Sequence, residues 1–166
     1  MRVLIVACGH TGVTLKVANK MAKMLSGVAV DVIDGKSKQD VSGYDVYVLG
    51  SNVHFGKLNK NFVKRLSEVT FVAPKAELYG YICGAEIEKS DLMIKKMSEL
   101  ASFALVRHVW GELNSSGTRF FRKFAIESFK KGRKDDGLPE PRILDKELKA
   151  IARAILEQKS IGKQDA

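Results

Sequence analysis

A glycine-rich loop follows the first apolar run of the chain and carries the chemistry of a phosphate site. The loop reads Gly9-His10-Thr11-Gly12-Val13-Thr14, and the apolar spacing of an amphipathic helix begins at its end. Backbone N–H groups at a helix N-terminus, together with two threonine hydroxyls, satisfy the oxygens of a phosphate dianion without an Arg or Lys. The loop therefore predicts a phosphate site. The simpler alternative is a glycine turn in which Thr14 caps the helix.

Three other kinds of phosphate or nucleotide site do not fit this loop. A dinucleotide site needs the spacing G-x-G-x-x-G, which residues 9–14 lack. A cysteine phosphatase that used Cys8 would need an Arg at the position of Thr14 to clamp the phosphate. A phospho-acceptor receiver domain would need acidic residues to hold a divalent ion where this strand ends in Ala7 and Cys8.

Two more loops follow apolar runs in the same way. Gly50 ends one run and leads into Ser51-Asn52-Val53-His54-Phe55-Gly56, and Cys83-Gly84-Ala85-Glu86 follows another. In an open parallel sheet, ligands bind at the carboxyl ends of the strands. We therefore expect all three loops to lie at one edge of the sheet.

Short apolar runs alternate with helical patterns along the chain. Strands are predicted over residues 2–7, 28–33, 44–49, 78–83 and 105–113, and helices over residues 14–25, 59–69, 90–103 and 145–158. Residues 34–43 are polar and predict little helix. Each parallel strand must return through a helix packed on the sheet, so this alternation predicts an α/β sandwich. Trp110 and His108 fall in the last predicted strand and are assigned to the core.

The first loop resembles the phosphate loop of flavodoxins, S/T-x-T-G-x-T, with Thr11, Gly12 and Thr14 matching and Gly9 lacking the first hydroxyl. Residues 44–56 are similar to the flavin ring loop, and the strand before it, of the flavodoxin-like menaquinone-dependent protoporphyrinogen dehydrogenases. The third loop matches mainly by its place. The resemblance covers nearly the whole chain. It implies a flavodoxin-like three-layer sandwich, with a five-stranded parallel sheet of order 2-1-3-4-5, helices on both faces, and one FMN-binding domain over residues 1–166.

The resemblance also implies a set of cofactor-binding residues. Phe55 would stack on the isoalloxazine face and Asn52 would bond the polar edge of the ring, with a plain core role as the alternative for Phe55. His54 is the one candidate for proton transfer, with a solvated loop histidine as the alternative. The cofactor-binding residues predicted are Gly9, His10, Thr11, Gly12, Val13, Thr14, Ser51, Asn52, Val53, His54, Phe55, Gly56, Cys83, Gly84, Ala85 and Glu86.

Composition narrows the class of protein. The chain has 166 residues, which suits one domain, and a net charge of +9, which favours anionic partners. Cys8 and Cys83 are too few and too far apart for a disulfide framework or a zinc site, so we expect free, packed thiols. The chain opens directly on a predicted strand without a recognisable leader. We therefore expect a cytoplasmic protein, with peripheral contact at the inner face of the membrane as a further option.

A basic, aromatic segment at about residues 115–137 is predicted to form an inserted helix. From Arg119 to Lys134 it carries seven basic residues and one acidic residue. Its pattern is typical of a helix at an anionic interface, and an ordinary helix with phenylalanines on the sheet is the alternative. We expect contact with an anionic membrane or an acidic protein through Arg119, Arg122, Lys123, Lys130 and Lys131. Nucleic acid is not favoured, because no aromatic recognition motif accompanies the charge.

Three functions remain open from the sequence. The resemblance implies an FMN-dependent oxidoreductase, of the kind that takes electrons from a porphyrinogen or another reduced organic molecule and passes them to a quinone. The second is a flavodoxin-type electron carrier without a small-molecule substrate of its own. The third is a flavin-free module that holds anionic surfaces through the basic helix.

Overall fold

The computed structural model describes residues 1–113 and 120–161, with the backbone alone at residues 120–122 and 159–161. Strands and helices alternate through most of this length, as the sequence predicts. In chain order the elements are β1 (Arg2–Cys8), α1 (Val13–Ala22), β2 (Ala29–Asp34), β3 (Val46–His54), β4 (Lys57–Leu58), α2 (Lys60–Val72), β5 (Glu77–Cys83), the 3₁₀-helix η1 (Ile87–Lys89), α3 (Ser90–Ser98), β6 (Leu105–His108), α4 (Phe120–Asp135) and α5 (Asp145–Ile161).

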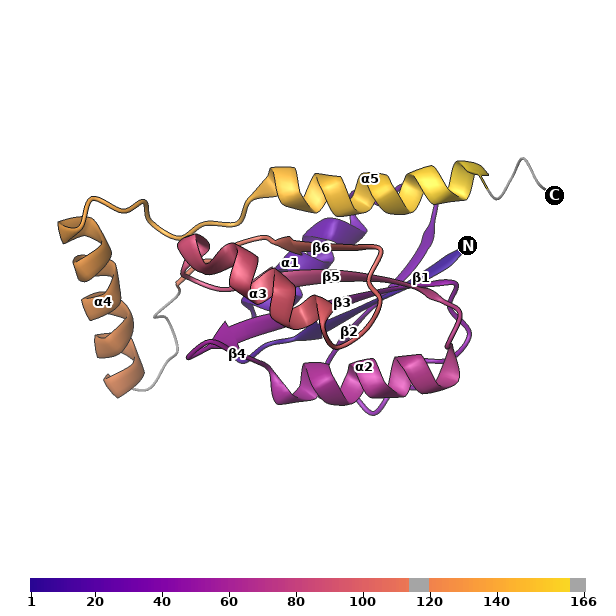
Figure 1. The fold of residues 1–166 in the computed structure, drawn as a ribbon, viewed down its shortest axis with the longest axis horizontal. Coiled ribbons are helices and arrows are strands. Elements are labelled where there is room, and N and C mark those ends of the chain that lie inside the picture. Colours follow the sequence, from indigo (N-terminus) through magenta and orange to yellow (C-terminus); the bar gives the residue numbers. More distant parts are fainter. Residues whose placement is uncertain (114–119, 162–166) are drawn as a thin grey trace.

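The main sheet is parallel, with strand order β2-β1-β3-β5-β6 (Figure 1). The short β4 lies off this path and pairs only with β3. Without it, β5 and β6 are the fourth and fifth strands, so the predicted order 2-1-3-4-5 is confirmed. β1 lies inside the sheet, where Val3 is in register with Val30 of β2 and Val46 of β3.

Helices cover both faces of the sheet, as expected for a flavodoxin-like sandwich (Figure 1). Successive side chains of a strand point to opposite faces, and β1 follows this rule. Val3 and Ile5 pack with residues of α1 and α5, whereas Leu4 and Val6 pack with residues of α2 and α3. All four side chains are fully buried. This double burial explains why β1 reads as an unbroken apolar run.

The largest differences between the predicted and observed element boundaries are at the ends of β3, β6 and α3. β3 runs on to His54, and β4 pairs back on it after a two-residue turn in which Phe55 and Gly56 have φ of 49° and 69°. In a sequence, Asn-Gly or Asp-Gly indicates a hairpin turn of this kind. Phe55-Gly56 does not carry this signal, so the sequence does not predict the turn. β6 ends at His108 instead of residue 113, and the left-handed φ of 60° at Trp110 prevents the strand from continuing. α3 ends at Ser98 instead of residue 103.

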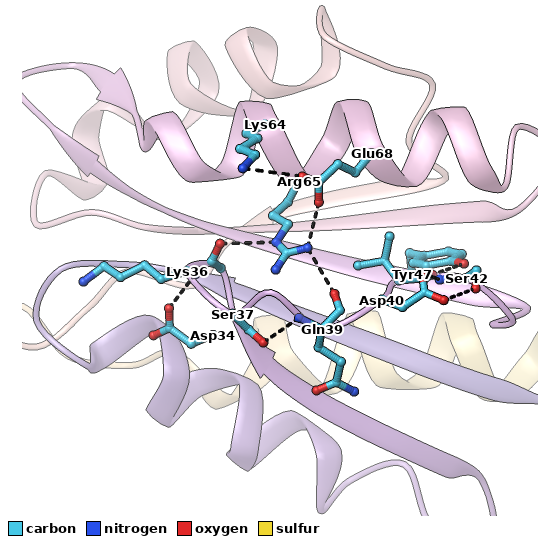
Figure 2. A network of polar contacts seen from close by, with 12 residues as sticks. Asp34, Lys36, Ser37, Gln39, Asp40, Ser42, Tyr47, Lys64, Arg65 and Glu68 are labelled. Carbon is cyan, nitrogen blue, oxygen red and sulfur yellow. Dashed lines mark hydrogen bonds and ion pairs between the residues drawn. The ribbon is translucent and has the colours of Figure 1, made fainter.

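A buried arginine fixes the polar loop that follows β2. Arg65 of α2 is 5% exposed, and Figure 2 shows its guanidinium pointing from the helix into this loop. Its Nε donates to the carbonyl of Gly35 at 3.2 Å, and its Nη1 donates to the carbonyl of Gln39 at 3.3 Å and to Glu68 at 2.7 Å. The loop contains no helix, as predicted, and these bonds hold it in place.

The helix α4 stands apart from the sandwich, on the side of the carboxyl ends of the strands (Figure 1). The inserted helix that the basic segment predicts is therefore present, but it does not lie on a face of the sheet. Within residues 1–113 and 120–161, no helix combines the length and apolar character needed to span a membrane.

Candidate functional site

A cavity of about 350 Å³ lies at the carboxyl ends of β1, β3 and β5, where the three predicted loops meet. Its other walls come from η1, α3, β6 and the residues after it, and α4. This volume falls in the range of small-molecule and cofactor sites, about 300 to 1,000 Å³. A shallower depression between α5 and Met24, which follows α1, contains none of the predicted site residues. The cavity is lined by Thr11, Val13, Asn52, Val53, His54, Phe55, Gly56, Cys83, Gly84, Ala85, Glu86, Lys89, Met93, His108, Gly111, Glu112, Leu113, Ala125, Ile126 and Phe129.

The loop after β1 presents backbone donors to this cavity. Gly12 is the N-cap of α1 in the left-handed conformation, with φ of 77°, which glycine adopts readily. No side chain caps the helix, so the alternative role of Thr14 as a cap is wrong. The N–H groups of Thr11, Gly12 and Val13 meet no acceptor in the described part of the chain. Free donors at the positive end of a helix are what a phosphate requires.

Thr14 lies beneath this loop, not in the cavity wall. Its side chain is 1% exposed, and its carbonyl accepts a hydrogen bond from the Tyr81 hydroxyl at 2.9 Å. The side chain also explains Gly9, because a Cβ added at Gly9 would lie 2.3 Å from Thr14 Oγ1. In this chain Gly9 therefore leaves room for the Thr14 side chain. Thr11 is the exposed threonine of this loop and lines the cavity.

The β3–β4 turn exposes an aromatic ring at the cavity. Phe55 is 89% exposed, so the alternative that it belongs to the core is wrong. A bulky residue with positive φ has a strained backbone, and burial of the Phe55 ring offsets little of this strain. The His54 ring lies beside it, with centroids 4.3 Å apart. His54 is exposed, as its solvated alternative predicts, and it lines the cavity as well.

A buried amide that sequence reasoning missed links the first two loops. Asn59 is 5% exposed and caps α2 by accepting a bond from the Asn61 N–H at 2.8 Å. Its Nδ2 donates to Asn52 Oδ1 at 2.8 Å and lies 3.2 Å from Nε2 of His10. Its own N–H donates to the Ser51 hydroxyl at 2.9 Å. Ser51 and His10 thus reach the site through Asn59, although neither lines the cavity.

The cysteines at this edge are packed thiols. Both are free and buried, as the sequence predicts. Burial raises the pKa of Cys83 to about 12, against a hydrogen bond with Thr14 that lowers it. Burial likewise raises the pKa of Cys8 to about 12. Because the thiolate is the reactive form, neither residue is a nucleophile near neutral pH.

The outer wall of the cavity comes from α4. Ala125, Ile126 and Phe129 line it, and Arg133 follows on the same face. Phe124 is 67% exposed, so the alternative that this phenylalanine packs on the sheet is wrong. Phe120, Phe121 and Arg122 have no described side chains, and Arg119 lies outside the described residues.

Arg133 anchors α4 to the sandwich. Its side chain is buried, and its Nη1 contacts the two carboxylate oxygens of Glu88 in η1 at 3.0 and 3.3 Å. The guanidinium also lies 5.9 Å from the ring centre of Trp110. Burial alone would raise the pKa of Glu88, but hydrogen bonds from its own backbone and from Arg133 lower it below its usual value. Glu88 therefore stays charged near neutral pH.

His108 of β6 and Trp110 just after it are buried, as the sequence predicts, and both also contact the site. His108 lines the cavity, and Trp110 lies behind the third loop, whose Ala85 carbonyl it holds. Their rings point at a loop some 25 positions earlier in the chain, which no local pattern reveals. Among the described residues, no group of three His, Cys, Asp or Glu side chains is arranged to hold a metal ion.

Comparison with known families agrees with this geometry. A family model described as a flavodoxin domain matches residues 4–138. The chain belongs to the flavodoxin domain family. No curated protein sequence matches it.

Solved structures share the fold, among them the following three. Rubredoxin oxygen:oxidoreductase from Desulfovibrio gigas has a TM-score of 0.57 at 12% identity, and the match covers 93% of this chain but 37% of that one. A short-chain flavodoxin associated with a bacterial microcompartment has a TM-score of 0.55 at 13% identity, over 82% of this chain and 98% of that one. A flavoprotein in complex with FMN from Lactobacillus acidophilus has a TM-score of 0.51 at 15% identity, over 63% and 91%. Identities this low establish the fold alone.

Proposed function

We propose that this chain binds FMN in the cavity at the carboxyl ends of β1, β3 and β5. The observation that carries the proposal is that one cavity gathers residues of all three loops in a flavodoxin fold. The similar flavoprotein from Lactobacillus acidophilus is in complex with FMN, which supports the assignment. The net charge of +9 favours a dianionic phosphate ester.

The residues at the cavity fit the parts of this cofactor. The N–H groups of residues 11–13, which meet no acceptor among the described residues, and the Thr11 hydroxyl suit the phosphate. The exposed ring of Phe55 suits the flat face of the isoalloxazine, and Asn52 suits its polar edge. Residues 83–86 also line the cavity. Bound FMN would supply the transfer of one or two electrons, while the protein sets its position and electrostatic surroundings.

The wall formed by α4 favours an enzyme over a carrier. Ala125, Ile126 and Phe129 add an apolar surface to the cavity beyond the three loops. An apolar wall of this kind suits a small organic substrate beside the cofactor. We therefore propose an FMN-dependent oxidoreductase. From the similarity of residues 44–56 to the menaquinone-dependent protoporphyrinogen dehydrogenases, we further propose a porphyrinogen as electron donor and a quinone as acceptor.

Titration of the purified protein with FMN tests the first step. We expect the visible flavin bands to shift and the flavin fluorescence to fall at one equivalent of FMN. Thr11→Ala should weaken binding by about tenfold, which corresponds to the loss of about 1.4 kcal/mol from a hydrogen bond to a charged group. Thr70→Ala, a change of the same type on α2 outside the cavity, is the control. Absence of binding by the unaltered protein would refute the proposal.

Anaerobic turnover tests the second step. The FMN-loaded protein is mixed with protoporphyrinogen and a soluble naphthoquinone, and porphyrin formation is followed by its absorption. Ile126→Asp should abolish turnover and leave FMN bound, because it places a charge on the α4 wall. A protein that binds FMN but turns over neither compound, and exchanges electrons rapidly with a partner protein, would be an electron carrier instead.

The outer face of α4 supports contact with an anionic surface. Lys123, Lys131 and Lys134 are exposed there beside Phe124, which is 67% exposed. Lys130 contacts Glu140 at 3.1 Å and is less available. We propose that this face meets an anionic membrane. Sedimentation with phosphatidylglycerol vesicles at low salt should show binding that Lys123→Glu with Lys131→Glu removes, while FMN stays bound. Equal sedimentation of this variant would refute the proposal.

A further inference from the structure

Two side chains at the end of β6 hold consecutive carbonyl groups of the third loop. The ring Nε2 of His108 lies 3.2 Å from the Gly84 carbonyl oxygen, and the indole N–H of Trp110 donates to the Ala85 carbonyl at 2.7 Å. Both side chains are 4% exposed. His108 ends β6, and Trp110 lies two positions later with a left-handed φ of 60°.

The chemistry of the two donors fixes the direction of each bond. A carbonyl only accepts, and an indole N–H only donates. For His108 to make its bond, Nε2 must therefore carry a proton. Its Nδ1 is buried and has no partner within residues 1–113 and 120–161, so a second proton there would have no acceptor. Burial lowers the pKa of His108 in agreement with this neutral form, although the Gly84 bond and the charge of Glu88 raise it.

These bonds dictate where the amides of the loop point. None of the described peptide bonds is cis, and in a trans peptide the C=O and the following N–H point in opposite directions. The N–H of Ala85 therefore points away from His108, and the N–H of Glu86 points away from Trp110. Neither N–H meets an acceptor in the described part of the chain. Both residues line the cavity.

We infer that His108 and Trp110 are positioning residues that orient the amides of Ala85 and Glu86 as a pair of hydrogen-bond donors for an oxygen acceptor of the molecule bound in the cavity. The inference rests on the proposed binding of FMN. It adds that two residues, at the end of β6 and just after it, hold this pair of N–H donors in position. Because reduction adds electron density to the flavin ring, donors that face a ring oxygen bind the reduced form more strongly than the oxidised form.

Loss of the hydrogen bond made by His108 or by Trp110 should therefore weaken FMN binding by a factor that depends on the oxidation state of the flavin. Trp110→Phe removes the N–H and keeps most of the ring. We expect it to weaken binding of oxidised FMN about tenfold and of reduced FMN by a larger factor. His108→Gln keeps a side-chain donor and should bind nearly as well as the unaltered protein, whereas His108→Leu should resemble Trp110→Phe.

Tyr47→Phe is a matched control. Tyr47 is a fully buried aromatic residue whose hydroxyl donates to the Val41 carbonyl at 2.7 Å, outside the cavity. Its loss should lower stability and leave both FMN affinities unchanged. If Trp110→Phe and His108→Leu match this control at equal folded fraction, the inference is wrong.

Amide chemical shifts of the unaltered protein give a readout that needs no variant to fold. On addition of FMN, the amide protons of Ala85 and Glu86 should move downfield. Binding of FMN without such movement would overturn the inference and leave the proposed function standing. No binding of FMN at all would overturn the proposed function first.

Discussion

The hydroxyl of Tyr81 donates a hydrogen bond of 2.9 Å to the carbonyl of Thr14 and so ties β5 to the first turn of α1. Gly50 makes this contact possible, because a Cβ at that position would lie 1.8 Å from Cζ of Tyr81. The bond spans 67 positions of the chain. It therefore helps to fix the position of the first loop, with its backbone N–H donors, relative to β5.

Tyr81→Phe should lower the free energy of unfolding by about 1 to 2 kcal/mol, because the buried carbonyl of Thr14 loses its donor. Urea unfolding at neutral pH measures the change. Tyr44→Phe is the control, since that hydroxyl bonds Asp31 at a half-exposed position. Its effect should be smaller. Equal losses in the two variants would contradict the assigned role of Tyr81.

Phe55→Ala should weaken FMN binding by about three- to tenfold, in line with an aromatic stacking contribution of about 0.5 to 1.5 kcal/mol. Stability should not fall, because the ring is 89% exposed and the strained turn gains a smaller residue. Phe71→Ala is a closely matched control, since Phe71 is 87% exposed at the far end of α2. Fluorescence titration compares the two variants. Identical FMN affinities would remove Phe55 from the site.

Gly9→Ala should destabilise the fold by about 1 to 3 kcal/mol through overpacking against Thr14. The Cβ would also lie 2.8 Å from Cβ of Thr14, so rotation of that side chain does not relieve the contact. Gly132→Ala on α4 is the control, because the described residues outside its own stretch of helix place no atom within 4 Å of the added Cβ. Alanine favours a helix, so Gly132→Ala should be neutral or stabilising. Thermal or urea unfolding that ranks the two variants alike would contradict this account.

Asn59→Ser should separate the two roles of Asn59. Serine keeps an oxygen to cap α2 but loses the amide that reaches Asn52 and His10. We expect weaker FMN binding with little loss of stability. Asn59→Ala loses the cap as well and should cost about 1 kcal/mol more. Unfolding and FMN titration of both variants test this, and a serine variant with unaltered affinity would show that Asn59 does not position the loops.

The sequence predicted those parts of the fold whose signal is local. β1 and β3 are buried on both faces, so their apolar runs are plain, and the parallel topology alone brings the loops after them to one edge. The residues it missed act on partners far away in the chain. Trp110 holds a carbonyl 25 positions earlier, and Arg133 contacts a carboxylate 45 positions earlier. The sequence also left open what α4 contacts, because the helix lines a cavity and does not pack on the sheet.

Glu88→Gln should loosen α4, because Arg133 is 5% exposed and would lose its charged partner. Loss of one member of a buried pair leaves the other charge uncompensated, and the half-exposed position of Glu88 moderates the cost. Amide hydrogen exchange over residues 123–135 should become faster, while exchange in β1 and β3 stays unchanged. Glu140→Gln is the control, since its contact with Lys130 is 3.1 Å long but Glu140 is 72% exposed. Exposed ion pairs of this kind contribute little to stability, so amide exchange in Glu140→Gln should match that of the unaltered protein. If both variants exchange alike, α4 is held by its apolar contacts with the cavity wall and not by Arg133.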